Sequence, residues 1–151
     1  MTMHARGFSL LETLLVVALL AIAGVLVAGA VTGGFRGMEL RGTAKEMATH
    51  LRYTRARAIS TGQSQRFTVD LRTRTWSGAN GREGEIPDGI AVEFTGAREV
   101  QPSESSGAIE FFPDGAATGG RIRLAIDDAA WQLDVAWLTG EVVVSRAGVD
   151  R

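Results

Sequence analysis

The sequence predicts an α+β fold in which one long N-terminal helix packs on a mostly antiparallel β-sheet domain. Two observations carry this prediction. Residues 1–61 contain an apolar stretch followed by an apolar stripe at helical spacing, whereas residues 62–151 contain short alternating segments separated by turn residues. The chain has 151 residues, so the part beyond the apolar stretch is long enough for one soluble domain of about a hundred residues.

An uncharged apolar stretch covers residues 14–31. As a helix with a rise of about 1.5 Å per residue it is roughly 27 Å long, which is close to one hydrocarbon thickness. Glu12 lies just before it, and a carboxylate there is costly in lipid unless it has a partner or a function. A secretory signal peptide with a cleavage site at residues 28–30 and a plain single-span anchor are the simpler interpretations, but each leaves Glu12 unexplained.

Residues 36–61 are predicted to form an amphipathic helix that Gly62 ends. One face carries residues spaced by three or four positions, which we interpret as core: Leu40, Ala44, Met47, Leu51, Thr54 and Ala58. The other faces carry six basic residues: Arg36, Arg41, Lys45, Arg52, Arg55 and Arg57. We expect these basic residues to be partly solvated and partly in contact with acidic partner surfaces or anionic lipid.

Residues 62–151 are predicted to be rich in β-strands. Alternating or β-prone residues mark seven segments: 65–71, 75–76, 90–94, 108–112, 121–126, 131–137 and 141–145. Trp131 and Trp137 are an even number of positions apart, so in one strand their side chains lie on the same face. We therefore expect both to pack in the core. Residues 96–107 are predicted to form an exposed loop, and Asp127-Asp128 a turn.

Charge and composition exclude several classes of function. The formal net charge is −1, but residues 1–61 carry 7 basic and 3 acidic side chains, and residues 62–151 carry 9 and 14. Because the β-rich part has a net charge of −5, nucleic acid is an unexpected partner. Cysteine is absent, and only His4 and His50 supply imidazole. The sequence therefore predicts no catalytic site, no metal site and no cofactor.

The segment Arg6-Gly7-Phe8-Ser9-Leu10-Leu11-Glu12 resembles the processing site of type IV pilins and pseudopilins. The resemblance implies that a prepilin peptidase removes residues 1–7 by cutting between Gly7 and Phe8, and that Phe8 is then N-methylated. Glu12 becomes the fifth residue of the mature chain, where it can pair with the N-terminal amine of a neighbouring subunit. Residues 8–35 would form the transmembrane and filament-core helix, and residues 36–151 a periplasmic globular domain.

Two turn motifs in the β-rich part make this resemblance more specific. Pro113-Asp114-Gly115 is predicted to form a turn, because proline fixes φ and glycine tolerates positive φ. Gly119-Gly120 lacks the lysine and the hydroxyl residue of a phosphate-binding loop and leads into a strand, so we interpret it as structural. Together with Leu138-Thr139-Gly140, these motifs are similar to those of GspH-type minor pseudopilins, in the GspH/FimT family.

The resemblance implies a structural subunit and not an enzyme. Such a minor pseudopilin belongs near the tip of the type II secretion pseudopilus, which supports export of folded proteins across the outer membrane. Its implied partners are other minor pseudopilins, the major pseudopilin, the prepilin peptidase and the inner-membrane assembly platform. Its implied location is the bacterial inner membrane, which it spans once, with the C-terminal domain in the periplasm. The alternative is a FimT-like minor pilin of a type IV pilus that binds DNA, which the acidic β-rich part disfavours.

Overall fold

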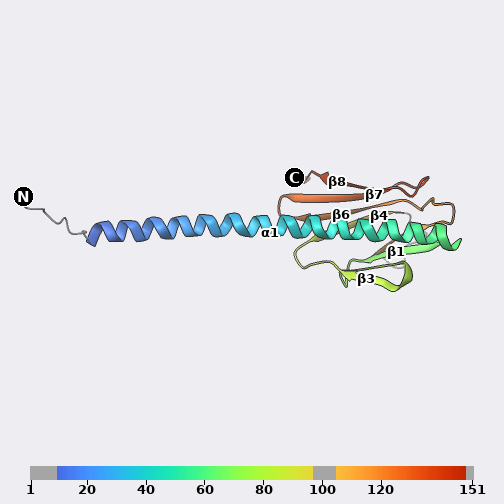
Figure 1. The fold of residues 1–151 in the computed structure, drawn as a ribbon, viewed down its shortest axis with the longest axis horizontal. Helices are drawn as coiled ribbons and strands as arrows, with labels where there is room; N and C mark the ends of the chain where they lie inside the picture. The colour runs from blue at the N-terminus through green and yellow to red at the C-terminus, as the bar shows by residue number, and fades with distance from the viewer. Residues whose placement is uncertain (1–9, 97–104, 149–151) are drawn as a thin grey trace, which may run out of the picture. The chain divides into compact units, whose positions relative to one another are not determined.

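The computed structural model describes residues 10–96 and 105–148, apart from the side chains of residues 26–33 (Figure 1). Gly7, Phe8 and most of the predicted loop 96–107 therefore lie outside the described residues. The chain divides into two compact units, Met1–Arg36 and Gly37–Arg151.

One helix, α1, runs from Leu10 to Thr61, so the long N-terminal helix is confirmed. The predicted apolar stretch 14–31 is helical in its backbone, and the leucines and valines described there have exposed side chains. Among the described residues, no helix meets the length and the apolarity needed to cross a membrane.

The second part of α1 buries the face that the sequence predicts. Its six stripe residues are all fully buried: Leu40, Ala44, Met47, Leu51, Thr54 and Ala58. The helix ends at Thr61, and Gly62 follows with φ of 66°, the left-handed conformation that commonly ends a helix. The predicted amphipathic helix and its end are therefore confirmed.

The first sheet contains β1 (Gln65–Asp70), β2 (Thr75–Gly78), β3 (Arg82–Glu85) and β5 (Ser106–Phe111), in the order β3-β2-β1-β5. In the β1–β2 turn, the backbone N–H groups of Arg72 and Thr73 donate to the Asp70 carboxylate, at 2.8 and 2.9 Å. The hydrogen bond from Thr73 is the main cause that lowers the pKa of Asp70. A short helical turn, η1 (Ala79–Gly81), joins β2 to β3.

The second sheet contains β4 (Ala91–Gly96), β6 (Gly120–Ile126), β7 (Ala129–Val135) and β8 (Val142–Ala147), in the order β4-β6-β7-β8. Asp127-Asp128 forms the tight β6–β7 turn, as predicted, and Asp127 takes a φ of 49°. In Figure 1, the strands of the two sheets are drawn on either side of the second part of α1.

The antiparallel pairing is confirmed, but the strands form two sheets and not one. The reason is that β1 pairs with β5, while the segment from Ile86 to Ile90 carries the chain across to the other sheet. Strand β3 was missed because its four residues, Arg82–Glu85, show no apolar alternation. The core prediction for Trp137 is wrong: β7 ends at Val135, and the Trp137 side chain is 69% exposed.

The largest fully buried side chain is Trp76 of β2. Its ring lies 4.3 Å from the His50 ring of α1 and 5.7 Å from the Phe67 ring of β1, measured between centroids. On the neighbouring strand β3, Gly84 is paired with Trp76, and a Cβ atom at Gly84 would overlap the indole. Gly84 therefore leaves the space that the largest core residue fills.

We expect Gly84→Ala to destabilise the protein by about 1–3 kcal/mol, because the added methyl group overpacks the core around Trp76. Gly42→Ala is the matched control, since a Cβ at this helical position meets nothing within 4 Å. That control should raise stability by about 0.5–1 kcal/mol through its helix propensity. Chemical denaturation of the full chain in mild detergent, followed by tryptophan fluorescence, measures both; equal effects would contradict the assigned packing.

Candidate functional site

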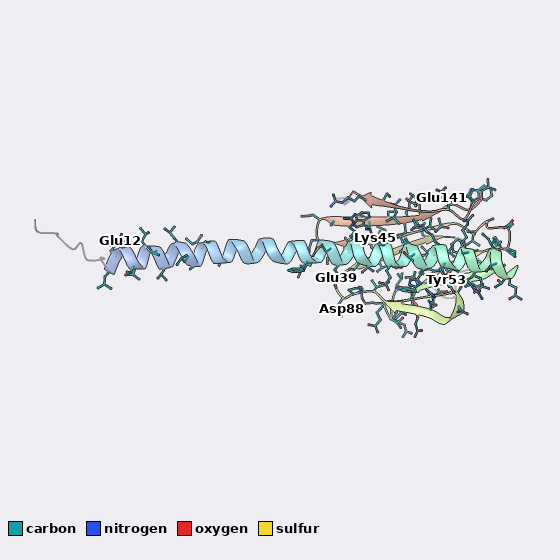
Figure 2. The ribbon with its side chains drawn as sticks, viewed as in Figure 1. Glu12, Glu39, Lys45, Tyr53, Asp88 and Glu141 are labelled. Carbon is teal, nitrogen blue, oxygen red and sulfur yellow. The ribbon has the colours of Figure 1, made fainter. Side chains whose placement is uncertain are left out.

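Glu12 lies in the first turn of α1, and its side chain is exposed (Figure 2). Its neighbours Leu10, Leu11, Leu14 and Leu15 are also exposed, with Leu10 reaching 83%. Glu12 forms no ion pair with any described residue. The helix therefore presents one carboxylate among apolar side chains.

The Pro113-Asp114-Gly115 motif forms the predicted turn. The N–H of Gly115 donates to the Phe112 carbonyl oxygen at 2.9 Å, and Gly115 has a φ of 89° that favours glycine. The N–H of Ala116 donates to the Asp114 carboxylate at 3.0 Å, which fixes the turn from its own side chain. The conformation of this turn therefore explains the residue types of the motif.

Leu138-Thr139-Gly140 forms a second turn, between β7 and β8. The N–H of Gly140 donates to the Ala136 carbonyl oxygen at 2.8 Å, and the N–H of Glu141 donates to the Thr139 hydroxyl at 3.3 Å. Gly140 has a φ of 62°. The side chain of Leu138 is 66% exposed.

The two turns contact each other, although about 25 residues separate them in the sequence. The N–H of Ala117 donates to the Trp137 carbonyl oxygen at 2.9 Å. A Cβ at Gly140 would overlap the Gly115 carbonyl oxygen, and one at Gly119 would lie 3.1 Å from the Trp137 Cβ atom. Glycine is thus needed where the two backbones approach most closely.

Gly119-Gly120 has the structural role that the sequence predicts. Gly120 begins β6, so the pair leads into a strand and not into a helix that could bind phosphate. A Cβ at Gly120 would lie 3.1 Å from the Ile109 side chain of β5 and 3.2 Å from the Thr95 carbonyl oxygen of β4. The pair therefore occupies a crowded point between the sheets.

Two arginines of α1 hold the paired turns, which sequence reasoning missed. Arg55 donates from Nε to the Gly115 carbonyl oxygen at 2.9 Å, and Arg52 donates from Nη2 to the Val142 carbonyl oxygen at 2.8 Å. The sequence assigned both arginines to solvent or to a partner. Because the two arginines are three residues apart, the sequence does indicate that they share one face of the helix. It does not indicate which distant carbonyl oxygens they bind.

The two arginines of β6 are paired with carboxylates. Arg121 contacts Asp134 at 2.7 Å, and Arg123 contacts Glu93 at 3.3 Å. Burial alone would raise the pKa of Asp134, but hydrogen bonds from Gln132 and Arg121 and the charge of Arg121 lower it. Because these guanidinium groups are already neutralised, they do not form a free basic patch.

The described residues contain no group of three side chains suited to a metal ion. The hydrogen bonds and close contacts of the paired turns give them a structural role within residues 37–151. The exposed start of α1 is a separate feature and belongs to the first unit.

Comparison with known proteins places this geometry in a family. The family described as type II transport protein GspH matches residues 43–140, which include most of the second part of α1 and both turns. A type II secretion system protein H from Xanthomonas campestris pv. campestris is 57% identical over 137 residues, covering 91% of this chain and 81% of that protein.

Two solved structures share the fold. The minor pseudopilin EpsH of the Vibrio cholerae type 2 secretion system aligns with a TM-score of 0.58 and 14% identity, covering 76% of this chain and 99% of that one. The type IV minor pilin FimU of Pseudomonas aeruginosa aligns with a TM-score of 0.55 and 16% identity, covering 71% and 88%. The match of the family over residues 43–140 and the 57% identity to a full-length relative show that this chain belongs to the GspH family of type II transport proteins.

Proposed function

We propose that this protein is a minor pseudopilin, a structural subunit near the tip of the type II secretion pseudopilus that supports export of folded proteins across the outer membrane. The observation that carries the proposal is its 57% identity to a type II secretion system protein H. The pilin-like fold and the carboxylate at the start of α1 are consistent with a subunit that works by packing.

The exposed apolar start of α1 supports assembly. Leu10, Leu14 and Leu15 are all more than half exposed, and such a row is unfavourable in water. Lipid covers it before assembly, with residues 8–35 as the anchor, and neighbouring helices cover it in the filament. Glu12 then pairs with the N-terminal amine that cleavage between Gly7 and Phe8 creates, and this ion pair compensates its burial.

The partners and location follow from the same proposal. A prepilin peptidase removes residues 1–7 and Phe8 is methylated, after which the assembly platform of the inner membrane adds the subunit beside other minor pseudopilins and the major pseudopilin. Residues 36–151 lie in the periplasm.

A DNA-binding minor pilin is the less supported alternative. The likeness to FimU shows the fold alone at 16% identity. Residues 62–151 have a net charge of −5, and Arg121 and Arg123 are paired with carboxylates. A net negative charge over this part of the chain disfavours strong, salt-dependent binding to DNA.

The paired turns have a structural role in this proposal. Pro113, Asp114 and Gly115 form one turn, Leu138, Thr139 and Gly140 form the other, and Gly119-Gly120 joins the first to β6. Since both turns bind arginines of α1, they hold the end of the second sheet against the helix.

When the chain is expressed with a prepilin peptidase, we expect the mature protein to begin at methylated Phe8, because the peptidase cuts after Gly7. Mass spectrometry of the intact protein and its N-terminal peptide measures this. A Gly7→Val variant serves as the control and should keep the leader. A mature chain that begins at Val31 would show a signal peptide and contradict the proposed anchor.

Glu12→Ala should leave folding and membrane insertion unchanged while it reduces incorporation into the filament, because the lost interaction is between subunits. Co-isolation of the variant with the major pseudopilin, compared with its level in the membrane fraction, measures incorporation. Glu39→Ala is the control, since this exposed carboxylate lies on α1 outside the apolar start. Normal incorporation of Glu12→Ala would remove the role assigned to Glu12.

Gly140→Ala should destabilise the protein by at least about 2 kcal/mol, because it combines a positive φ with overlap against the Gly115 carbonyl oxygen. Gly148→Ala is the control, since a Cβ there meets nothing within 4 Å. Proteolysis of the full chain at increasing urea concentrations measures both variants. Similar resistance in the two variants would show that the turns do not depend on this close approach.

A further inference from the structure

A hollow of about 530 Å³ lies between the last turns of α1 and the turn that leads into β8. Its lining consists of Arg52, Arg55, Thr139, Gly140, Glu141 and Val142. Figure 2 shows Glu141 beside this turn, at the same end of the unit as the end of α1. The hollow is therefore built by the two arginines and the second motif turn.

The two guanidinium groups keep their full charge. Arg52 and Arg55 each make one described hydrogen bond, to the neutral carbonyl oxygens of Val142 and Gly115, and neither has an ion pair among the described residues. A guanidinium has five N–H donors, so most of their hydrogen-bonding capacity is unused. Like charges three residues apart on a helix also repel each other, and an anion between them would relieve that repulsion.

The chain does not neutralise this charge from within. Glu141 lines the hollow, but it forms no ion pair with any described residue and its side chain is exposed. The two arginines of β6 differ, because Arg121 and Arg123 are each paired with a carboxylate. Among the described residues, Glu141 is thus the one carboxylate in the lining of the hollow, and it forms no ion pair with Arg52 or Arg55.

Two exposed apolar residues precede Thr139 in the turn that lines the hollow, although neither is part of the lining itself. Trp137 and Leu138 belong to the same turn as Thr139, and their side chains are 69% and 66% exposed. The close approach of Gly140 to Gly115 holds this turn in place. Tryptophan and arginine are among the residues that dominate protein–protein binding, and a preorganised backbone lowers the entropic cost of binding.

We propose that this hollow binds a carboxylate side chain from an acidic segment of a different protein subunit, with Trp137 and Leu138 packed against the apolar residue beside that carboxylate. The positive charge selects an anion, and planar guanidinium groups can bind a carboxylate with two parallel hydrogen bonds. Because Trp137 and Leu138 are apolar, they favour a polypeptide ligand over a free anion. The proposal rests on the proposed function in so far as the partner is another subunit of the pseudopilus.

Photo-crosslinking in cells tests the site on the full chain. A photoreactive amino acid replaces Thr139, which lines the hollow, and mass spectrometry identifies the adduct formed with the intact secretion system present. We expect one major adduct, with a segment of another subunit that contains Asp or Glu. An adduct with a second copy of this chain, or with a segment that lacks a carboxylate, would overturn the proposal.

Charge variants then distinguish the site from a structural role. Arg52→Gln keeps a donor for the Val142 carbonyl oxygen but loses the charge, so adduct yield should fall roughly tenfold, the loss of one charge-assisted hydrogen bond. Glu141→Gln removes a competing carboxylate and should raise the yield. Arg57→Gln is the control, because Arg57 does not line the hollow, and it should change nothing. Unchanged yield in both Arg52→Gln and Glu141→Gln would overturn the carboxylate site.

A charge swap completes the test. Arg52→Glu should abolish the adduct, and replacing the mapped carboxylate in the partner with arginine should restore it; failure of this rescue overturns the pairing. Co-isolation with the major pseudopilin is measured in the same cells. Normal incorporation without the expected adduct would refute this site and leave the proposed function intact, whereas loss of incorporation in the unmodified chain would refute both.

Discussion

Burial of one face of α1 is the constraint on which the rest of residues 37–151 depends. Each sheet has an apolar face, and the stripe from Leu40 to Ala58 is part of the single core cluster that contacts both. The His50 ring contacts the Trp76 ring of the first sheet at a tilt of 32°, while Arg41 lies over Trp131 of the second sheet. Because one helix covers two sheets, a change in its buried face affects both sheets.

Local periodicity explains what the sequence could predict. The stripe of α1, the helix end at Gly62 and the Asp127-Asp128 turn each depend on residues within a few positions of one another, and the structure confirms all three. The Pro113-Asp114-Gly115 turn was also predicted from its residues, since proline fixes φ and Gly115 adopts a positive φ.

Long-range pairing explains what the sequence could not predict. Pairing of β1 with β5 and not with β4, which splits the strands into two sheets, is a contact between residues about 40 positions apart. Trp137 lies an even number of positions after Trp131, so the alternating pattern predicted that both side chains face the core. The strand ends at Val135, before Trp137, and the Trp137 side chain is exposed. Carbonyl oxygens carry no side-chain signature, so the roles of Arg52 and Arg55 were invisible in the sequence.

This chain has two kinds of contact surface, and they differ in how strictly they select a neighbouring subunit. The apolar start of α1 offers leucines that pack against any similar helix, so it can stabilise assembly with little choice of neighbour. A charged hollow with fixed guanidinium groups rejects a neighbour that lacks a carboxylate, because the desolvated charges would stay unpaired. A subunit that takes one particular place in an assembly of similar helices needs selectivity of this second kind. The paired turns make the hollow rigid enough to provide it, since Arg55, Gly115 and Gly140 fix one another.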